Sequence, residues 1–224
     1  MSNRQASHVP IQRCGLVLRG FPALMLAAAL LLSCTAPQPE GGPVYRSERG
    51  YSLELPAQWI VVNQLDIGGR ENPIGTDNPR IRGLFTAEGL KALKEKALSG
   101  GVELFVNLET SDETFMESIN VQMAPGSVAV EDSDAVPACA ETEKRLAALY
   151  GNPVKMDACK ALKIQRMPAF FMEYQVENLA LAHAQYLIQL KANFYVVMTL
   201  TCRPKNLPKL RPEFDVIAAS FRAT

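Results

Sequence analysis

This sequence has no excess of charge of either sign, few histidines and few long hydrophobic runs. Its 224 residues carry 23 Lys and Arg against 23 Asp and Glu, and it has only two histidines. A nucleic-acid-binding protein needs a basic surface to replace the counterions of the phosphates, so a net charge of zero argues against that class. The five cysteines include no Cys-x-x-Cys pair, and no His/Cys cluster typical of a zinc site is present. We therefore expect no nucleic-acid partner, no metal and no cofactor.

The N-terminal segment has the composition of an export signal. Residues 1–20 include Arg4, Arg13 and Arg19 but no acidic residue, and an apolar run follows at residues 21–32. As a helix this run spans about 18 Å, well short of the hydrocarbon core of about 30 Å in a bilayer. The pattern favours a signal peptide, with an uncleaved membrane anchor as the alternative.

The apolar run ends in Leu31-Leu32-Ser33-Cys34, which resembles the lipobox of bacterial lipoproteins. The resemblance implies that residues 1–33 are removed and that Cys34 becomes a lipidated N-terminus; an ordinary cysteine near a conventional cleavage site is the alternative. Two or three acyl chains anchor a protein stably without a membrane span. Enterobacterial lipoproteins retained at the inner membrane have aspartate where this chain has Thr35, so the resemblance favours the periplasmic face of the outer membrane.

Removal of the leader changes the charge of the chain. Three arginines and no acid leave with residues 1–33, so 20 basic and 23 acidic residues remain and the net charge becomes about −3. Residues 34–43 are rich in Pro and Gly, which predicts a short flexible tether. Residues 44–224 have the size of one domain.

Alternating apolar residues predict an antiparallel sheet in this domain. The predicted strands are 44–46, 51–55, 102–108, 115–123, 162–176, 182–190 and 194–202, with a further apolar stretch at 59–62. Helical periodicity starts after Thr86, at Cys139 and at Pro212, and the last helix places Phe214, Ile217, Ala218 and Phe221 on one stripe. We expect an α+β domain whose antiparallel sheet of about six or seven strands is flanked by about three helices.

The two ends of the domain resemble PsbP-like domains. The first end carries Tyr45, Gly50-Tyr51-Ser52-Leu53, Pro56 and Trp59; the second carries the hairpin around residues 186–201 and then Ser220-Phe221-Arg222. The resemblance implies an antiparallel sheet sandwiched between helices. Together with the lipobox it makes the chain most similar to lipoproteins of the DcrB type.

The cysteines of the mature chain predict one disulfide. Cys139, Cys159 and Cys202 permit three pairings in an oxidising compartment. We favour Cys139 with Cys159, because they flank one helix and the loop returning from it, and closing a loop of about 20 residues would stabilise the fold by roughly 3 kcal/mol. Cys202 shares one face of its strand with Phe194, Val196, Met198 and Leu200, so we expect a buried, unreactive thiol.

No catalytic constellation stands out among the remaining residues. His183 alternates with Gln185 and Gln189, which favours a position on the surface of a strand over a catalytic base. The acidic residues between 131 and 134 lack the spacing of a calcium loop and are interpreted as a solvated loop.

The segment 66–82 is rich in Gly, Asn and Pro and has no regular period, which predicts a long loop. Its Arg70, Ile74, Arg80 and Arg82 are candidates for contact with a partner or with lipid headgroups. We therefore expect a non-enzymatic lipoprotein of the bacterial cell envelope that is held to the membrane by its lipid anchor and binds or stabilises another envelope protein. Two alternatives are a periplasmic carrier of a small molecule or lipid, which uses a pocket between sheet and helices, and a hydrolase of unrecognised type.

Overall fold

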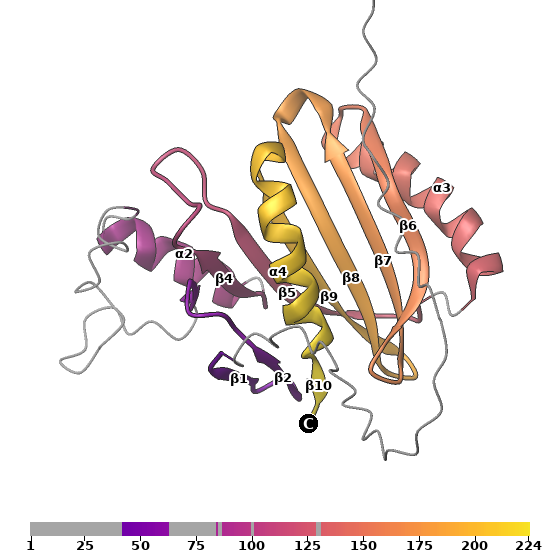
Figure 1. The fold of residues 1–224 in the computed structure, drawn as a ribbon, viewed down its shortest axis with the longest axis horizontal. Helices are drawn as coiled ribbons and strands as arrows, with labels where there is room; N and C mark the ends of the chain where they lie inside the picture. Colours follow the sequence, from indigo (N-terminus) through magenta and orange to yellow (C-terminus); the bar gives the residue numbers. More distant parts are fainter. Residues whose placement is uncertain (1–41, 63–83, 85–86, 100, 129–130) are drawn as a thin grey trace, which may run out of the picture. The chain divides into compact units, whose positions relative to one another are not determined.

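The central element of the structure is a seven-stranded sheet in which all neighbouring strands run antiparallel (Figure 1). The computed structural model describes residues 42–62, 84, 87–99, 101–128 and 131–224, which belong to one compact unit, Pro39–Thr224. In spatial order the strands are β3 (Trp59–Val61), β4 (Glu103–Asn107), β5 (Ser118–Pro125), β9 (Phe194–Cys202), β8 (Leu181–Lys191), β7 (Met167–Val176) and β6 (Val154–Ile164).

A second, smaller sheet joins the two ends of the domain. It has the order β1 (Val44–Ser47), β2 (Tyr51–Glu54) and β10 (Arg222–Ala223). The β1–β2 hairpin agrees with the sequence prediction, and its turn contains Gly50 at φ +88°, a backbone conformation that favours glycine. The ring of Tyr51 stacks on Phe221 with 5.3 Å between the ring centroids, which ties the hairpin to the C-terminus.

Among the described residues, three α-helices flank the large sheet, and two short 3-10 helices connect its elements. The α-helices are α2 (Ala87–Ser99), α3 (Asp132–Tyr150) and α4 (Leu207–Ala219); the 3-10 helices are η2 (Glu177–Leu179) and η3 (Pro204–Asn206). Successive side chains of a strand point to opposite faces, and β7 shows which helix covers which face. Phe171 belongs to the apolar cluster that contains α4, whereas Phe170 and Met172 pack in the cluster that contains α3. The predicted α+β layered fold is therefore confirmed.

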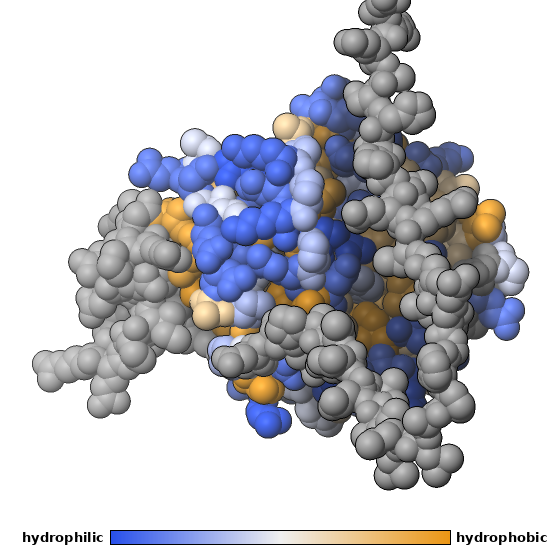
Figure 2. Space-filling model, in the orientation of Figure 1, coloured by the Kyte–Doolittle hydropathy of each residue, from blue (hydrophilic) through white to orange (hydrophobic). Residues whose placement is uncertain are grey.

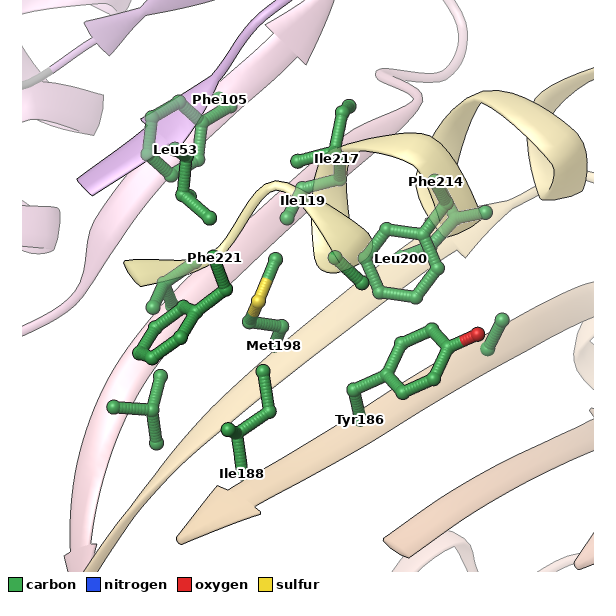
Figure 3. Close-up of a cluster of buried hydrophobic side chains, with 14 of the residues drawn as sticks. Leu53, Phe105, Ile119, Tyr186, Ile188, Met198, Leu200, Phe214, Ile217 and Phe221 are labelled. Atoms are coloured by element: carbon green, nitrogen blue, oxygen red, sulfur yellow. The ribbon is translucent and has the colours of Figure 1, made fainter. Parts of the chain in front are cut away.

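The main core lies between α4 and the sheet. Figure 3 shows Phe214 and Ile217 of α4, with Phe221 just beyond it, among side chains that come from the strands. The four residues of the predicted helical stripe, Phe214, Ile217, Ala218 and Phe221, are all fully buried, as the sequence predicted. Burying a large apolar side chain contributes about 1.5 to 3 kcal/mol, so this stripe holds α4 on the sheet.

Two helices begin earlier than the sequence predicted. Helix α3 begins at Asp132 instead of Cys139, and α4 begins at Leu207 instead of Pro212. Both helices contain a proline at their sixth residue, Pro137 in α3 and Pro212 in α4, where each proline removes one i→i−4 hydrogen bond of the helix. The interpretation of the acidic segment 131–134 as a loop is wrong, because this segment is the N-terminal cap and first turn of α3.

The predicted strand 162–176 is two strands joined by a tight turn. Strand β6 begins at Val154, and β6 and β7 meet at Gln165 and Arg166, where Gln165 has φ +57°. A bulge near Asp157 interrupts the alternation of side chains in β6. The sequence pattern therefore did not predict the first half of this strand. Within the described residues, no helix combines the length and the hydrophobicity needed to cross a bilayer.

Candidate functional site

A pocket of about 280 Å³ lies between the C-terminal half of α4, the end of β6 and Tyr186 of β8. We call it the α4–β6 groove, and the residues that line it are Leu162, Lys163, Ile164, Gln165, Tyr186, Asp215, Ala218 and Ala219. Figure 2 shows hydrophobic residues exposed beside the hydrophilic outer surface of α4. The pocket exists because α4 presents two alanines there, and such small side chains leave room above the strands.

Charged and aromatic side chains lie beside the α4–β6 groove, one turn closer to the N-terminus of α4. The Arg211 guanidinium lies over the Phe171 ring at 4.2 Å from its centroid, and its Nε is 3.0 Å from a carboxylate oxygen of Glu173. Arg211 also pairs with Asp215, one turn further along α4. Arg211 therefore fills the space over Phe171, so the pocket is confined to the C-terminal end of α4.

Tyr186 forms the polar wall of the pocket. Its hydroxyl donates a 2.6 Å hydrogen bond to Asp215. Burial of the phenol, helped by this bond to a carboxylate, raises the pKa of Tyr186 well above 10. Tyr186 therefore stays neutral, and its ring offers an apolar surface to a ligand. Gln165 closes the rim by donating a 2.7 Å hydrogen bond to the carbonyl of Ala219.

The chemistry of the α4–β6 groove is that of a binding site. Leu162, Ile164 and Ala218 form an apolar floor, and Lys163 and Asp215 offer one charge of each sign at the rim. Ligand pockets commonly combine an apolar lining with a few polar groups. The groove therefore suits a small apolar group, such as an aromatic or aliphatic side chain of a partner or a small molecule.

His183 lies inside the protein, so its predicted surface position is wrong. The residue is only 4% exposed, and its ring stacks between Tyr150, the last residue of α3, and Tyr174 of β7. Its Nδ1 is 3.1 Å from the Thr201 hydroxyl, and its Nε2 is 3.3 Å from the Tyr150 hydroxyl. Burial lowers the pKa of His183 from 6.5 to about 4. The cluster fastens the C-terminal end of α3 to the sheet.

The structure supports the predicted pairing of cysteines. Cys139 of α3 and Cys159 of β6 form a disulfide, which links the helix to an edge strand. Cys202 is a free, fully buried thiol in the main core. Burial, with a smaller contribution from the Glu117 charge, raises the pKa of this thiol to about 12, so it is unreactive as expected.

A buried ion cluster that the sequence did not reveal lies at the opposite end of the sheet from the pocket. Glu117 is fully buried and accepts hydrogen bonds from the backbone N of Arg203 (3.0 Å), from the Arg203 Nε (2.9 Å) and from Asn206 (2.6 Å). The other side of the Arg203 guanidinium pairs with Asp112, whose pKa is lowered well below its usual value by hydrogen bonds from Thr114 and then from Arg203. These residues are far apart in the sequence, and no local pattern marks them.

A second buried carboxylate connects the two sheets. Glu103 of β4 accepts hydrogen bonds from the hydroxyls of Tyr45 (2.8 Å), Ser47 (2.6 Å) and Tyr51, all from the β1–β2 hairpin. Every donor that the structure gives it is neutral, and three such bonds satisfy most of the acceptor sites of a carboxylate. Glu103 and Glu117 thus serve to hold elements together, and neither faces the α4–β6 groove.

Several residues singled out from the sequence lie outside the described residues. These are Cys34, the residues before it, and the loop residues Arg70, Ile74, Arg80 and Arg82. Among the residues that the structure does describe, no group of three His, Cys, Asp or Glu is arranged to hold a metal ion.

Comparison with known proteins finds similarity only among solved structures. No protein-family model matches the chain, and no curated protein is significantly similar to it in sequence. The similar structures include cyanobacterial PsbP (CyanoP) from Synechocystis, which is 15% identical, with 87% of this chain and 99% of that chain covered at a TM-score of 0.49.

Two further similar structures come from distant organisms. LpqN of Mycobacterium tuberculosis, described as involved in cell envelope biogenesis, is 12% identical, with 83% of this chain and 91% of LpqN covered at a TM-score of 0.47. The Ran-binding protein Mog1p of Saccharomyces cerevisiae is 14% identical, with coverages of 81% and 94% and a TM-score of 0.48. These similarities assign no function to the chain.

Proposed function

We propose that this protein is a lipoprotein of the bacterial cell envelope, of the DcrB type, whose folded domain binds another envelope component without catalysing a reaction. The observation that carries the proposal is the order of features at the N-terminus: an acid-free segment with three arginines, an apolar run too short to span a bilayer, and Leu31-Leu32-Ser33-Cys34 at its end. The domain faces the periplasm, and Thr35 favours the outer membrane.

The placement of ionisable and apolar groups in the folded domain supports a binding role. Its ionisable groups with displaced pKa values are either buried among their own partners, as His183 is, or paired on the surface, as Asp112 is. The α4–β6 groove, in contrast, is open and has an apolar floor with a charged rim. An open apolar surface of this kind is where a protein partner places a side chain.

Lipidation is tested by labelling cells with radioactive palmitate. We expect the native chain to be labelled and to fractionate with membranes, and we expect Cys34→Ala to lose the label because the thioether cannot form. Cys14→Ala is the matched control, since Cys14 lies within the leader and its removal should leave labelling unchanged. Label retained by Cys34→Ala, or absent from the native chain, would refute the anchor.

Partner binding is tested by photo-crosslinking in intact cells. Ala219 lines the pocket and is exposed, so a photo-reactive amino acid at this position should trap one discrete partner. Ala148 on α3 is also exposed and provides the control position. The same crosslinker at Ile74 tests the predicted loop contact. If Ala219 and Ile74 give only uncrosslinked monomer, the partner-binding role is wrong.

The pocket also favours a second candidate function, a periplasmic carrier of a small molecule or lipid. Its volume of about 280 Å³ is near the lower end of the range for ligand sites, so it holds a ligand of about ten non-hydrogen atoms or one end of a longer chain. Native mass spectrometry of the protein purified from membranes should then show a bound adduct. Ala219→Trp should displace it by filling the pocket, and repeated absence of an adduct from the native protein would remove this alternative.

A further inference from the structure

One end of the domain gathers the two hairpin turns, the C-terminus and the small sheet. The β6–β7 and β8–β9 turns lie at the same end of the large sheet because Ala169 pairs with Ile188 and the strands alternate in direction. The carbonyl of Ala219 accepts hydrogen bonds from Gln165 in the first turn and from Arg222 in β10. Figure 1 shows these turns, β10 and the C-terminus together at the bottom of the view.

This end carries exposed basic side chains, which we call the basic end: Arg46, Lys163, Arg166, Lys191 and Arg222. Arg46 and Arg222 are both paired with Ser52 in the small sheet, so they point to the same face. None of the five forms an ion pair with another described residue. The small sheet and its turn also contribute Glu48 and Glu54, and the acidic N-terminus of α3 begins near this end at Glu131; the five basic residues are concentrated at the two hairpin turns and on one face of the small sheet.

Exposed apolar side chains accompany these charges. Phe194 opens β9 beside the β8–β9 turn and is 45% exposed, and Val44 opens β1 and is 54% exposed. Basic residues interspersed with exposed aromatic and aliphatic residues are the composition of surfaces that contact a membrane interface.

The chain leading to the anchor ends at this part of the domain. Pro43 accepts a hydrogen bond from Leu55, and Val44 pairs with Glu54, whose backbone N bonds to Ser220 at the end of α4. Residues 34–43 reach at most about 35 Å even when fully extended. A domain on so short a tether meets the membrane surface continuously, and an anionic bilayer attracts each nearby Lys or Arg.

We propose that the basic end docks on anionic phospholipid headgroups of the membrane that holds the anchor, with Phe194 entering the interfacial layer. The proposal rests on the lipid anchor proposed above. It fixes the orientation of the domain: the basic end faces the membrane, while the end with the Glu117–Arg203 cluster faces away. The α4–β6 groove then opens close to the headgroups, since Lys163 and Gln165 belong to its rim.

The test uses the full chain, purified from membranes and reconstituted into vesicles that contain brominated lipids, which quench nearby tryptophan. The native Trp59 is 5% exposed and supplies the baseline. We expect Phe194→Trp to be strongly quenched in vesicles with phosphatidylglycerol and only weakly in pure phosphatidylcholine, and we expect added salt to remove the difference. Leu149→Trp, at an exposed position at the far end of α3, is the matched control and should stay at the baseline.

Charge-reversal variants test whether the basic residues cause the docking on anionic vesicles. Lys163→Glu/Arg166→Glu should reduce the quenching of Phe194→Trp to the level in pure phosphatidylcholine, whereas Lys144→Glu/Lys205→Glu, at exposed positions elsewhere, should not. Circular dichroism confirms that each variant is folded. Quenching of Phe194→Trp no greater than that of Leu149→Trp in anionic vesicles, or quenching insensitive to the first pair, would overturn the proposal. Palmitate labelling reports on the anchor separately, so failure of docking and failure of anchoring are distinguishable.

Discussion

Removal of the Cys139–Cys159 disulfide should destabilise the domain by about 3 kcal/mol. The bond closes a loop with a sequence separation of 20 residues. In the chain-entropy model the loss of this closure gives the unfolded chain about 11 cal/mol/K of additional entropy, which is about 3.3 kcal/mol at 25 °C. Both half-cystines are only partly buried, so Cys139→Ala/Cys159→Ala loses little packing, and the loop closure should account for most of the effect.

Urea unfolding followed by circular dichroism measures this difference. With a slope of about 2 kcal/mol per molar urea, a loss of 3.3 kcal/mol lowers the midpoint by about 1.6 M. Reductant should lower the midpoint of the native chain by the same amount and leave that of the double variant unchanged. Cys202→Ala is the control and should retain the response to reductant. A shift of less than about 0.5 M between the native chain and the double variant would refute the reasoning, because loop closure would then contribute too little.

Three further predictions concern buried side chains. Glu117→Ala should cost roughly 3 kcal/mol in urea unfolding, because Arg203 and Asn206 lose their shared acceptor, and a cost below about 1 kcal/mol would contradict the role of the cluster. Burial lowers the pKa of His183 to about 4, so as the pH falls the imidazole is protonated in the unfolded chain before it is protonated in the folded one. The contribution of His183 to the free energy of unfolding should therefore be fully present above pH 6.5 and should fall by about 3 kcal/mol toward pH 4. His183→Gln should flatten this pH profile. Phe214→Ala should cost about 3 to 5 kcal/mol by leaving a cavity under α4, whereas the exposed Val216→Ala should change unfolding by less than about 0.5 kcal/mol.

The periodicity of apolar residues correctly predicted the helices and strands whose side chains alternate regularly between buried and exposed positions. The apolar stripe of α4 and the β8–β9 hairpin are correct because each repeats with the period of its own secondary structure over several turns or pairs. The same periodicity did not predict the whole of β6. The bulge near Asp157 moves the following side chains to the opposite face, and both faces of this edge strand are partly exposed. The prolines at 137 and 212 hid the true starts of α3 and α4, since a proline usually marks the start of a helix, whereas here each lies inside its helix.

The candidate site could not be predicted from the sequence, because it depends on packing between residues that are distant in the sequence. The sequence indicated only that a pocket between sheet and helices would suit a carrier, and the pocket arises because Ala218 and Ala219 face Leu162, more than 50 positions earlier. His183 was assigned to the surface because its neighbours in β8, Gln185 and Gln189, are polar. Its burial comes from Tyr150, which the last turn of α3 places over the strand. The pairing of Cys139 with Cys159 was more accessible, because these two cysteines flank one predicted helix and the chain returning from it, whereas Cys202 falls on an apolar strand face.

The two faces of the sheet separate the thiols of this domain. Cys139 and Cys159 lie on the face covered by α3, whereas Cys202 lies in the core beneath α4, so the full thickness of the sheet stands between them. A domain that folds before it meets an oxidant therefore has a single pair of sulfurs within reach. A chain oxidised while still unfolded chooses among three pairings, two of which trap Cys202 on the wrong side. If folding precedes oxidation, the separation of the thiols by the sheet is sufficient to select the native bond.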